Sequence, residues 1–177
     1  MDDVEWPVLE TDAEYETGWY DGGYDLVEQP NGTQKRYYWA DLPPAVVVVP
    51  IDGEDVIFVE QYRPTIRKRC LELPAGIVEA DEDYAGAGAR ELAEETGFSP
   101  ASITHLQTVD VATGVLRHER GYVVATELAS GPQSLDENEF LSVKRVSRSA
   151  AIDRARAQPA NDATLEALLL AEVDGFL

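Results

Sequence analysis

Residues 76–98 read GIVEADEDYAGAGARELAEETGF. This stretch predicts one helix over residues 83–96, because an acidic first turn suits the positive end of the helix dipole and Gly97 suits a left-handed C-terminal cap. Residues that recur at spacings of four and three predict an apolar stripe on this helix, made of Ala85, Ala89 and Leu92.

The helix also gathers acidic side chains, since Glu91, Glu94 and Glu95 stand three and four residues apart or adjacent. Like charges at such spacing destabilise an isolated helix by roughly 0.2–0.5 kcal/mol per pair. A divalent cation would reverse that cost, because Mg²⁺ and Mn²⁺ bind carboxylate oxygens together with substrate phosphates and water. Three glutamates alone favour the simpler interpretation, a solvated helix face, so the surrounding residues decide between the two.

Those surrounding residues complete a pattern, Gly76-x5-Glu82-x7-Arg-Glu-Leu-x-Glu-Glu-x-Gly-Phe98, which resembles the Nudix box and matches it at all nine specified positions. The resemblance implies an α/β fold, the Nudix α/β/α sandwich with a mixed central sheet. It also implies hydrolysis of the pyrophosphate in a nucleoside diphosphate linked to another moiety, with Mg²⁺ (Mn²⁺ is possible) as cofactor. In such a site Glu91 and Glu95 bind the metal, Glu94 can join when further ions bind, and Arg90 orients the carboxylates.

Two flanking motifs are similar to the ADP-ribose pyrophosphatase branch of this family: Gln61-Tyr-Arg63-Pro, and Glu72-Leu-Pro-Ala75 directly before the box. The branch implies that the Ala75 carbonyl joins the metal shell. Arginine matches phosphate oxygens bidentately, and Arg63 directly follows a predicted strand, so we predict that Arg63 binds phosphate. Arg67 and Glu72 complete the predicted substrate-binding set. A solvated basic loop is the alternative for Arg63 and Arg67.

The same branch implies a general base on an acidic loop after the box. Residues 135–143 form such a loop running into a strand, and either Glu137 or Glu139 matches the catalytic position. Spacing does not choose between them, and an ordinary acidic turn is the alternative. If the loop does not supply the base, Glu94 of the box is the next candidate for that catalytic role. Gly114 stands where the branch usually carries a proline, which leaves the substrate open.

These resemblances favour ADP-ribose as substrate, cleaved to AMP and ribose 5-phosphate. Another nucleoside diphosphate sugar or a dinucleotide is the alternative within the same enzyme class. A ligand-sensing module that keeps the fold but has lost catalysis belongs to a different class. Such a module would show an eroded box, and this box is intact.

The rest of the chain predicts mainly strands. Residues 1–14 show little periodicity and are predicted to be loose, whereas residues 18–27 and 35–39 are predicted strands that flank Asn31-Gly32, a strong hairpin signal. Unbroken β-branched runs predict two buried strands joined at an Asp-Gly turn, at residues 45–50 and 56–60. After the box, two further strands are predicted at residues 103–111 and 121–128, and two helices at residues 149–158 and from 161 onward. In the last helix Asn161 is the predicted cap, and the leucines predicted to pack inward are Leu165, Leu168 and Leu169.

We divide the chain into an N-terminal β extension, residues 1–43, and a Nudix hydrolase domain, residues 44–177. The extension is antiparallel and carries all three tryptophans. The resemblance implies that it builds a homodimer, and packing within its own sheet is the alternative role for these aromatic residues.

The net charge of −20, from 34 acidic and 14 basic residues, would repel nucleic acid and anionic membrane, so neither is an expected partner. Acidic excess with three lysines is typical of adaptation to a salt-rich cytoplasm, so we predict a halophilic protein. Residues 1–60 hold 15 acids and two bases, and residues 61–100 hold eight and five. The anionic substrate is expected in this more balanced segment.

A cytoplasmic location fits three further observations. The single cysteine, Cys70, excludes an intrachain disulfide. No apolar run approaches the roughly 18 residues needed to span a bilayer. The first residues lack the basic and apolar regions of a signal peptide.

Overall fold

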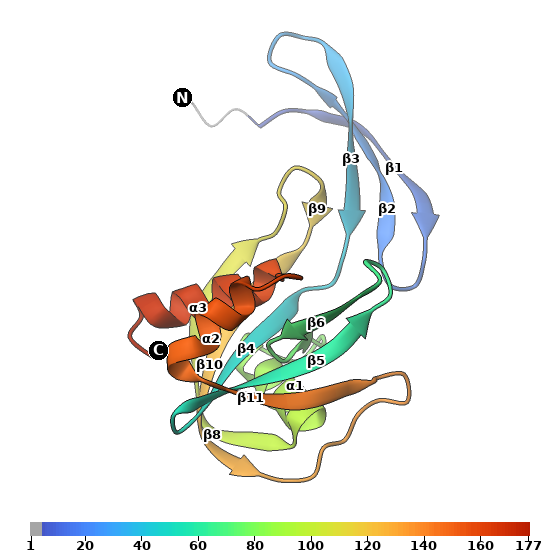
Figure 1. Ribbon diagram of the computed structural model, residues 1–177. Helices are drawn as coiled ribbons and strands as arrows, with labels where there is room; N and C mark the ends of the chain where they lie inside the picture. Colours follow the sequence, from blue (N-terminus) through green and yellow to red (C-terminus); the bar gives the residue numbers. More distant parts are fainter. Residues whose placement is uncertain (1–4) are drawn as a thin grey trace. The chain divides into compact units, whose positions relative to one another are not determined.

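The computed structural model describes residues 5–177, which form two compact units (Figure 1). One comprises the described residues up to Pro44 together with Val109–Glu119, and the other comprises Ala45–Thr108 with Arg120–Leu177. Residues 109–119 fall within the predicted Nudix hydrolase domain, but in the structure they belong to the first unit. The reason is that β9 (Leu116–Arg117) pairs with β3 (Gln34–Asp41). The predicted domain boundary after residue 43 stays a prediction.

The first unit is a four-stranded sheet in the order β1-β2-β3-β9. β1 (Val8–Glu16), β2 (Asp21–Glu28) and β3 are antiparallel, and β9 runs parallel to β3. The β2–β3 hairpin turns at Gly32, whose φ of 78° confirms the Asn31-Gly32 prediction. The prediction of loose structure before residue 15 was wrong over β1, because β2 supplies hydrogen-bond partners that local periodicity does not reveal.

The second unit is built on a seven-stranded sheet in the order β11-β5-β4-β10-β8, with β6 beside β5 and β7 beside β4. β4 runs antiparallel to β5 and parallel to β10, which confirms the mixed central sheet. Its strands are β4 (Ala45–Asp52), β5 (Asp55–Arg63), β6 (Lys68–Glu72), β7 (Ala75–Ile77), β8 (Phe98–Asp110), β10 (Glu119–Ser130) and β11 (Leu141–Ser147).

Helices cover both faces of this sheet, as Figure 1 shows for α1 (Tyr84–Thr96) on one side and α2 (Arg148–Arg156) and α3 (Asp162–Val173) on the other. Because successive strand residues point to opposite faces, Val48 and Val123 pack with Leu92 of α1. The neighbouring Tyr122 instead donates its hydroxyl to Glu166 of α3. The α/β/α sandwich is therefore confirmed.

Close approach to the sheet explains a glycine within α1. A Cβ at Gly88 would lie 2.9 Å from Val123 Cγ2 and 3.3 Å from Val48 Cγ2, closer than ordinary packing permits. Gly97 ends the helix at a φ of 77°, as predicted. The first turn contains no acid, because Asp83 is instead the N-cap and accepts a hydrogen bond from Gly86 N. The predicted acidic first turn was therefore wrong.

The side of α1 that is buried differs from the predicted stripe. Ala85 and Ala89 are only partly buried, whereas the buried residues are Ala87, Gly88, Glu91, Leu92, Glu95 and Thr96.

In α3 Asn161 is the N-cap, as predicted, and Leu168 is buried, but Leu169 is 46% exposed. Across residues 5–177, no helix is long and apolar enough to cross a bilayer.

Candidate active site

Two glutamates of α1 are buried against β7. Glu91 is 9% exposed and Glu95 only 4%. Glu95 Oε2 accepts a hydrogen bond of 3.2 Å from Ala75 N, and the carboxylate of Glu91 lies against the Cα of Gly76. The structure therefore brings the predicted metal ligands Ala75, Glu91 and Glu95 together at one end of β7.

This burial has an electrostatic cost. It raises the pKa of Glu95 to about 8, and the charges of Glu91 and Glu139 act in the same direction, while the Ala75 N–H opposes them. Burial also raises the pKa of Glu91, although hydrogen bonds from Arg90 favour its charged form. Two desolvated carboxylates close together leave negative charge only partly compensated in the protein alone.

Arg90 supplies part of the compensation. Its Nε and Nη2 donate to the two carboxylate oxygens of Glu82, at 2.9 and 2.8 Å, and Nη2 also donates to Ile77 O at 2.9 Å. Nη1 donates to Glu91 Oε1 at 2.7 Å and to Glu94 Oε2 at 3.2 Å. The hydrogen bonds to Glu82, followed by those to Glu91, raise the pKa of Arg90. Arg90 thus holds the carboxylates of Glu82, Glu91 and Glu94 in place. The side chain of Glu94 is the most exposed of the three, at 45%.

The donor set suits a hard divalent cation that substrate helps to bind. Among residues 5–177, no group of three or more His, Cys, Asp or Glu side chains could hold a metal ion unaided. Mg²⁺ commonly takes one or two carboxylates and fills its shell with substrate phosphates and water. Glu91 and Glu95 offer such oxygens, and the raised pKa of each reflects a charge that a cation would offset. The residues present therefore fit Mg²⁺ or Mn²⁺.

A second buried carboxylate, Glu72, orients the predicted phosphate ligand. Glu72 is 3% exposed, and its Oε2 accepts hydrogen bonds from Arg63 Nη2 at 2.6 Å and Arg63 Nε at 3.0 Å. Gln61 Nε2 donates to the same oxygen at 3.0 Å, and Asn161 Nδ2 donates to Oε1 at 3.2 Å. The guanidinium of Arg63 is therefore held along one edge.

Arg63 also lies within electrostatic reach of the α1 glutamates. Burial opposes its charged form, but hydrogen bonds to Glu72 and the charge of Glu95 raise its pKa. In return, the charge of Arg63 lowers the pKa of Glu95. Arg67 differs, because it lies in the exposed turn between β5 and β6, and its side chain has no hydrogen bond or ion pair with any described residue. The structure thus joins Arg63 to the acidic site but does not bring Arg67 to it.

The acidic loop after β10 contributes Glu139. Asp136 N donates to Glu139 Oε2 at 3.0 Å, and Glu139 N donates to Asp136 O at 2.9 Å, which makes a compact turn. The charge of Glu139 acts on both Glu91 and Glu95. Glu137 is exposed, whereas Glu139 is partly buried.

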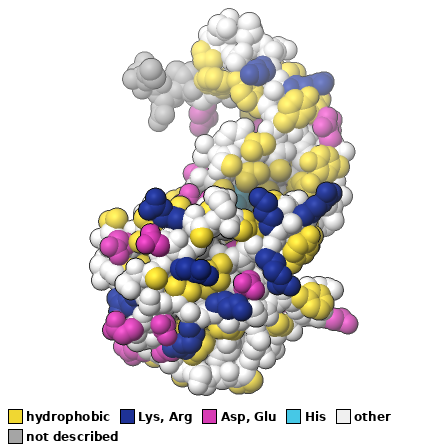
Figure 2. Space-filling view, in the orientation of Figure 1, with side chains coloured by type: hydrophobic (Ala, Val, Ile, Leu, Met, Phe, Trp, Pro, Cys, Tyr) yellow, Lys and Arg dark blue, Asp and Glu magenta, His cyan; other side chains and the backbone are white. Residues whose placement is uncertain are grey.

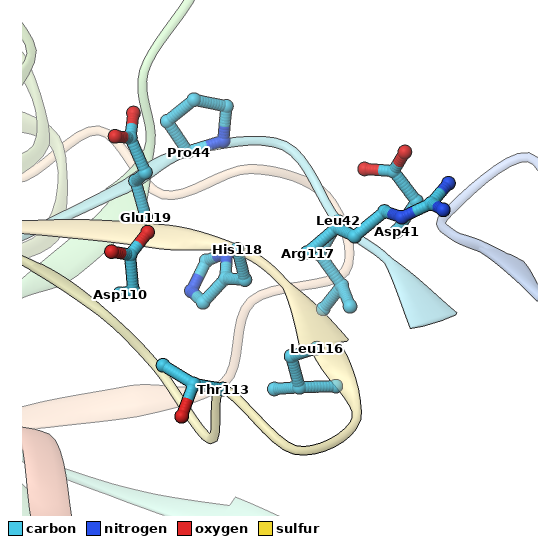
Figure 3. Close-up of a pocket in the computed structure, with 9 residues that line it drawn as sticks. All are labelled: Asp41, Leu42, Pro44, Asp110, Thr113, Leu116, Arg117, His118 and Glu119. Carbon is cyan, nitrogen blue, oxygen red and sulfur yellow. The ribbon is translucent and has the colours of Figure 1, made fainter. Parts of the chain in front are cut away.

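An open pocket of about 630 Å³ lies within the first unit (Figure 3). On one side of the pocket His118 Nδ1 is 2.9 Å from Pro43 O. The guanidinium of Arg117 stacks on the Trp39 ring and donates a hydrogen bond to Asp25. None of its lining residues belongs to the predicted catalytic, metal or substrate set; they are Asp41, Leu42, Pro44, Asp110, Thr113, Leu116, Arg117, His118 and Glu119.

Sequence reasoning missed three side chains that support the site. Gln61 and Asn161 donate to Glu72, and Gln133 Nε2 donates to the carbonyl oxygen of Glu95 at 2.5 Å. Asn161 was recognised only as a helix cap. Gln133 has no local signal at all, because its partner is 38 residues away along the chain.

The fold and the box residues agree with a comparison against protein families. The model described as "NUDIX domain" matches residues 41–168, and the chain therefore belongs to the Nudix family. Within that family it is a hydrolase with ADP-ribose pyrophosphatase relatives.

One relative is the ADP-ribose pyrophosphatase of Bacillus subtilis, 30% identical over 140 residues, which are 77% of this chain and 76% of the relative. The methanol dehydrogenase activator of Bacillus methanolicus is 34% identical over 122 residues, 67% of this chain and 66% of the relative. A crystal structure of an ADP compounds hydrolase superposes with a TM-score of 0.88 at 24% identity and covers 98% of both chains. At that identity the match supports the fold alone.

Proposed function

We propose that this Nudix hydrolase cleaves the pyrophosphate of a nucleoside diphosphate linked to another moiety in a Mg²⁺-dependent reaction. The observation that carries the proposal is the buried pair Glu91 and Glu95, held against Ala75 and Gly76 with the charge of Arg63 close by. Two carboxylates and one cationic side chain are the groups needed at a metal-bound pyrophosphate.

Glu91, Glu95 and the carbonyl of Ala75 would hold the ion, and Glu94 is available for a further one. When bound, Mg²⁺ would supply Lewis-acid polarisation and neutralise charge on the phosphates. Arg63 binds a phosphate oxygen through Nη1, which has no hydrogen bond with any residue in the described part of the chain, while Nε and Nη2 are held by Glu72. We therefore assign Glu72 the task of orienting Arg63, which replaces the direct substrate contact predicted for it.

Glu139 is our preferred general base, because it is the loop glutamate whose charge acts on Glu91 and Glu95. It takes a proton from the attacking water while the water oxygen bonds to phosphorus and the bridging P–O bond breaks. Glu137 is the alternative. Arg90 does not contact the reacting atoms in this scheme and serves to position Glu91 and Glu94.

ADP-ribose is the substrate we favour, with AMP and ribose 5-phosphate as products. The Bacillus subtilis relative bears the name ADP-ribose pyrophosphatase, and this chain matches about three quarters of it, 76%. Gly114, where that branch usually carries proline, keeps other nucleoside diphosphate sugars and dinucleotides as alternatives.

A hydrolysis panel tests the proposal. The full chain is incubated with ADP-ribose, other nucleoside diphosphate sugars and dinucleotides, each with Mg²⁺, with Mn²⁺ and with EDTA. We expect AMP and ribose 5-phosphate from ADP-ribose with Mg²⁺ and none with EDTA, and we expect the Glu95→Gln variant to lose activity. Faster hydrolysis of another compound would change the substrate. Failure to cleave any compound with either metal would overturn the proposed function.

We also propose that the first unit forms a homodimer. Some of its aromatic residues pack within the sheet, as Tyr24 does against Tyr38. Other large hydrophobic side chains of this unit are exposed, namely Trp6, Val8, Leu9, Tyr15 and Trp19, and Tyr38 keeps 56% of its surface exposed. Figure 2 shows hydrophobic side chains gathered on this part of the surface. Light scattering of the full chain should give twice the chain mass, and a monomer at micromolar concentration would contradict this. The cytoplasmic location stays a prediction.

A further inference from the structure

The C-terminal end of α1 is capped from a distant part of the chain. A helix leaves its last four carbonyls without partners inside the helix. At α1, Ser134 N donates to Glu94 O at 3.0 Å, and Gln133 Nε2 donates to Glu95 O at 2.5 Å. Two of these carbonyls therefore belong to the residues whose side chains form the acidic site.

The capping segment, residues 131–134, lies directly on the end of the helix. Gly131 N donates to Gly97 O at 2.6 Å. A Cβ at Gly97 would approach Gly131 O to 2.5 Å and Gln133 N to 3.0 Å, so even a methyl group would separate the two. The contact is thus a close backbone approach, reinforced by the side chain of Gln133.

The capping segment leads directly into the acidic loop. Glu139 follows Gln133 by six residues, and the loop ends where Leu141 pairs with Gln61 of β5. The loop is therefore fixed at both ends, at α1 on one side and beside the Arg63 strand on the other. With so few residues between the two fixed points, the position of the capping segment limits where Glu139 can lie.

From these contacts we infer that Gln133 is a positioning residue, which fixes the acidic loop at a constant position relative to the metal-binding end of α1. The inference rests on the proposed function for its kinetic consequence only. Gln133 does not touch substrate or metal in this scheme. Its hydrogen bond links the main chain of Glu95 to the segment that carries Glu139. The distance between the general base, Glu139, and the metal ligand, Glu95, is therefore kept constant.

Three variants test the inference. Gln133→Ala removes the donor but leaves both backbone hydrogen bonds, so we expect kcat to fall about fivefold, the effect of one ordinary hydrogen bond, with KM nearly unchanged. Gln133→Lys restores a donor and places a cation at the negative end of the helix, so it should recover most of the lost kcat. Gln107→Ala is the matched control, because Gln107 is also an exposed glutamine whose Nε2 donates to a backbone carbonyl, that of Thr108. It should leave kcat unchanged.

Hydrogen exchange separates this inference from the proposed function. Amides of residues 134–140 in the metal-free full chain should exchange faster in Gln133→Ala than in the unmodified protein and in Gln133→Lys. Unchanged exchange would overturn the anchor even if no substrate is hydrolysed. Faster exchange together with unchanged kcat would overturn the positioning role while leaving the hydrolase intact. A Gln133→Lys variant with a kcat as low as that of Gln133→Ala would do the same.

Discussion

The carboxylate of Glu91 occupies the space where a side chain at position 76 would begin. A Cβ built on Gly76 would lie 2.0 Å from both Cδ and Oε1 of Glu91. The glycine that opens the box is therefore required by its contact with the glutamate fifteen positions later, and any larger residue would push that carboxylate away from β7.

Gly76→Ala should reduce kcat by about a hundredfold, because displacing a catalytic group by about 1 Å can cost that much. The fold should persist, since the glutamate rather than the sheet gives way. Gly86→Ala is a control for the substitution itself, because Gly86 is exposed and a Cβ there meets only Asp83 Oδ1, at 3.2 Å. Steady-state kinetics with circular dichroism makes the comparison. Near-normal kcat in Gly76→Ala would show that the precise place of Glu91 does not matter.

The metal-free protein should become less stable as pH rises. The pKa of Glu95 is raised from its ordinary value of 4.5 to about 8, so between these values the folded state binds more protons than the unfolded state. Stability from the protonated form is present at low pH and is lost as pH rises through about 8. Glu91 shifts in the same direction.

Thermal melting in EDTA across that pH window measures this dependence. Glu95→Gln cannot ionise, so its melting temperature should fall less steeply with pH, and excess Mg²⁺ should flatten the decline in the unmodified protein. If wild type and variant show equal slopes, Glu95 does not carry the raised pKa.

Glu139→Gln should lower kcat by about 10²–10⁴-fold, the usual contribution of a general base, with little change in KM. Glu137→Gln is the matched comparison, and we expect it to keep most of the activity because Glu137 is exposed. A loss confined to Glu137→Gln would transfer the role to that residue. Full activity in the double variant would exclude the acidic loop as the source of the base.

Stability should rise with KCl from low salt into the molar range. Every residue of β1 is exposed, and the strand carries four acids, Glu10, Asp12, Glu14 and Glu16, whose mutual repulsion is screened by salt. Melting temperatures in KCl, compared with an uncharged osmolyte at equal osmolality, isolate the screening effect. A flat or falling curve in KCl would remove the prediction of a halophilic protein.

The sequence by itself determined the local features of this protein. Glycines such as Gly32 and Gly97 can adopt a left-handed backbone without the steric cost of a Cβ, so they mark turns and helix ends, and β-branched runs such as that of β4 predict buried strands. Helical periodicity places Glu91 and Glu95 on one side of α1, so the box could be recognised and its acidic cluster predicted before any contact was known.

The tertiary structure decided which groups share that site. Of the predicted apolar stripe of α1, Leu92 is buried but Ala85 and Ala89 are only partly buried, because the buried side is turned toward Glu91 and Glu95. Burying these two carboxylates is unfavourable for the helix alone and is offset by partners such as Arg90 and Ala75 N. Asn161 reaches Glu72 across 89 residues of sequence, and Gln133 reaches Glu95 across 38. Such contacts leave no periodic pattern, because they form where separate elements pack. The chain alone specifies each element, and packing brings the polar groups of different elements within hydrogen-bond distance.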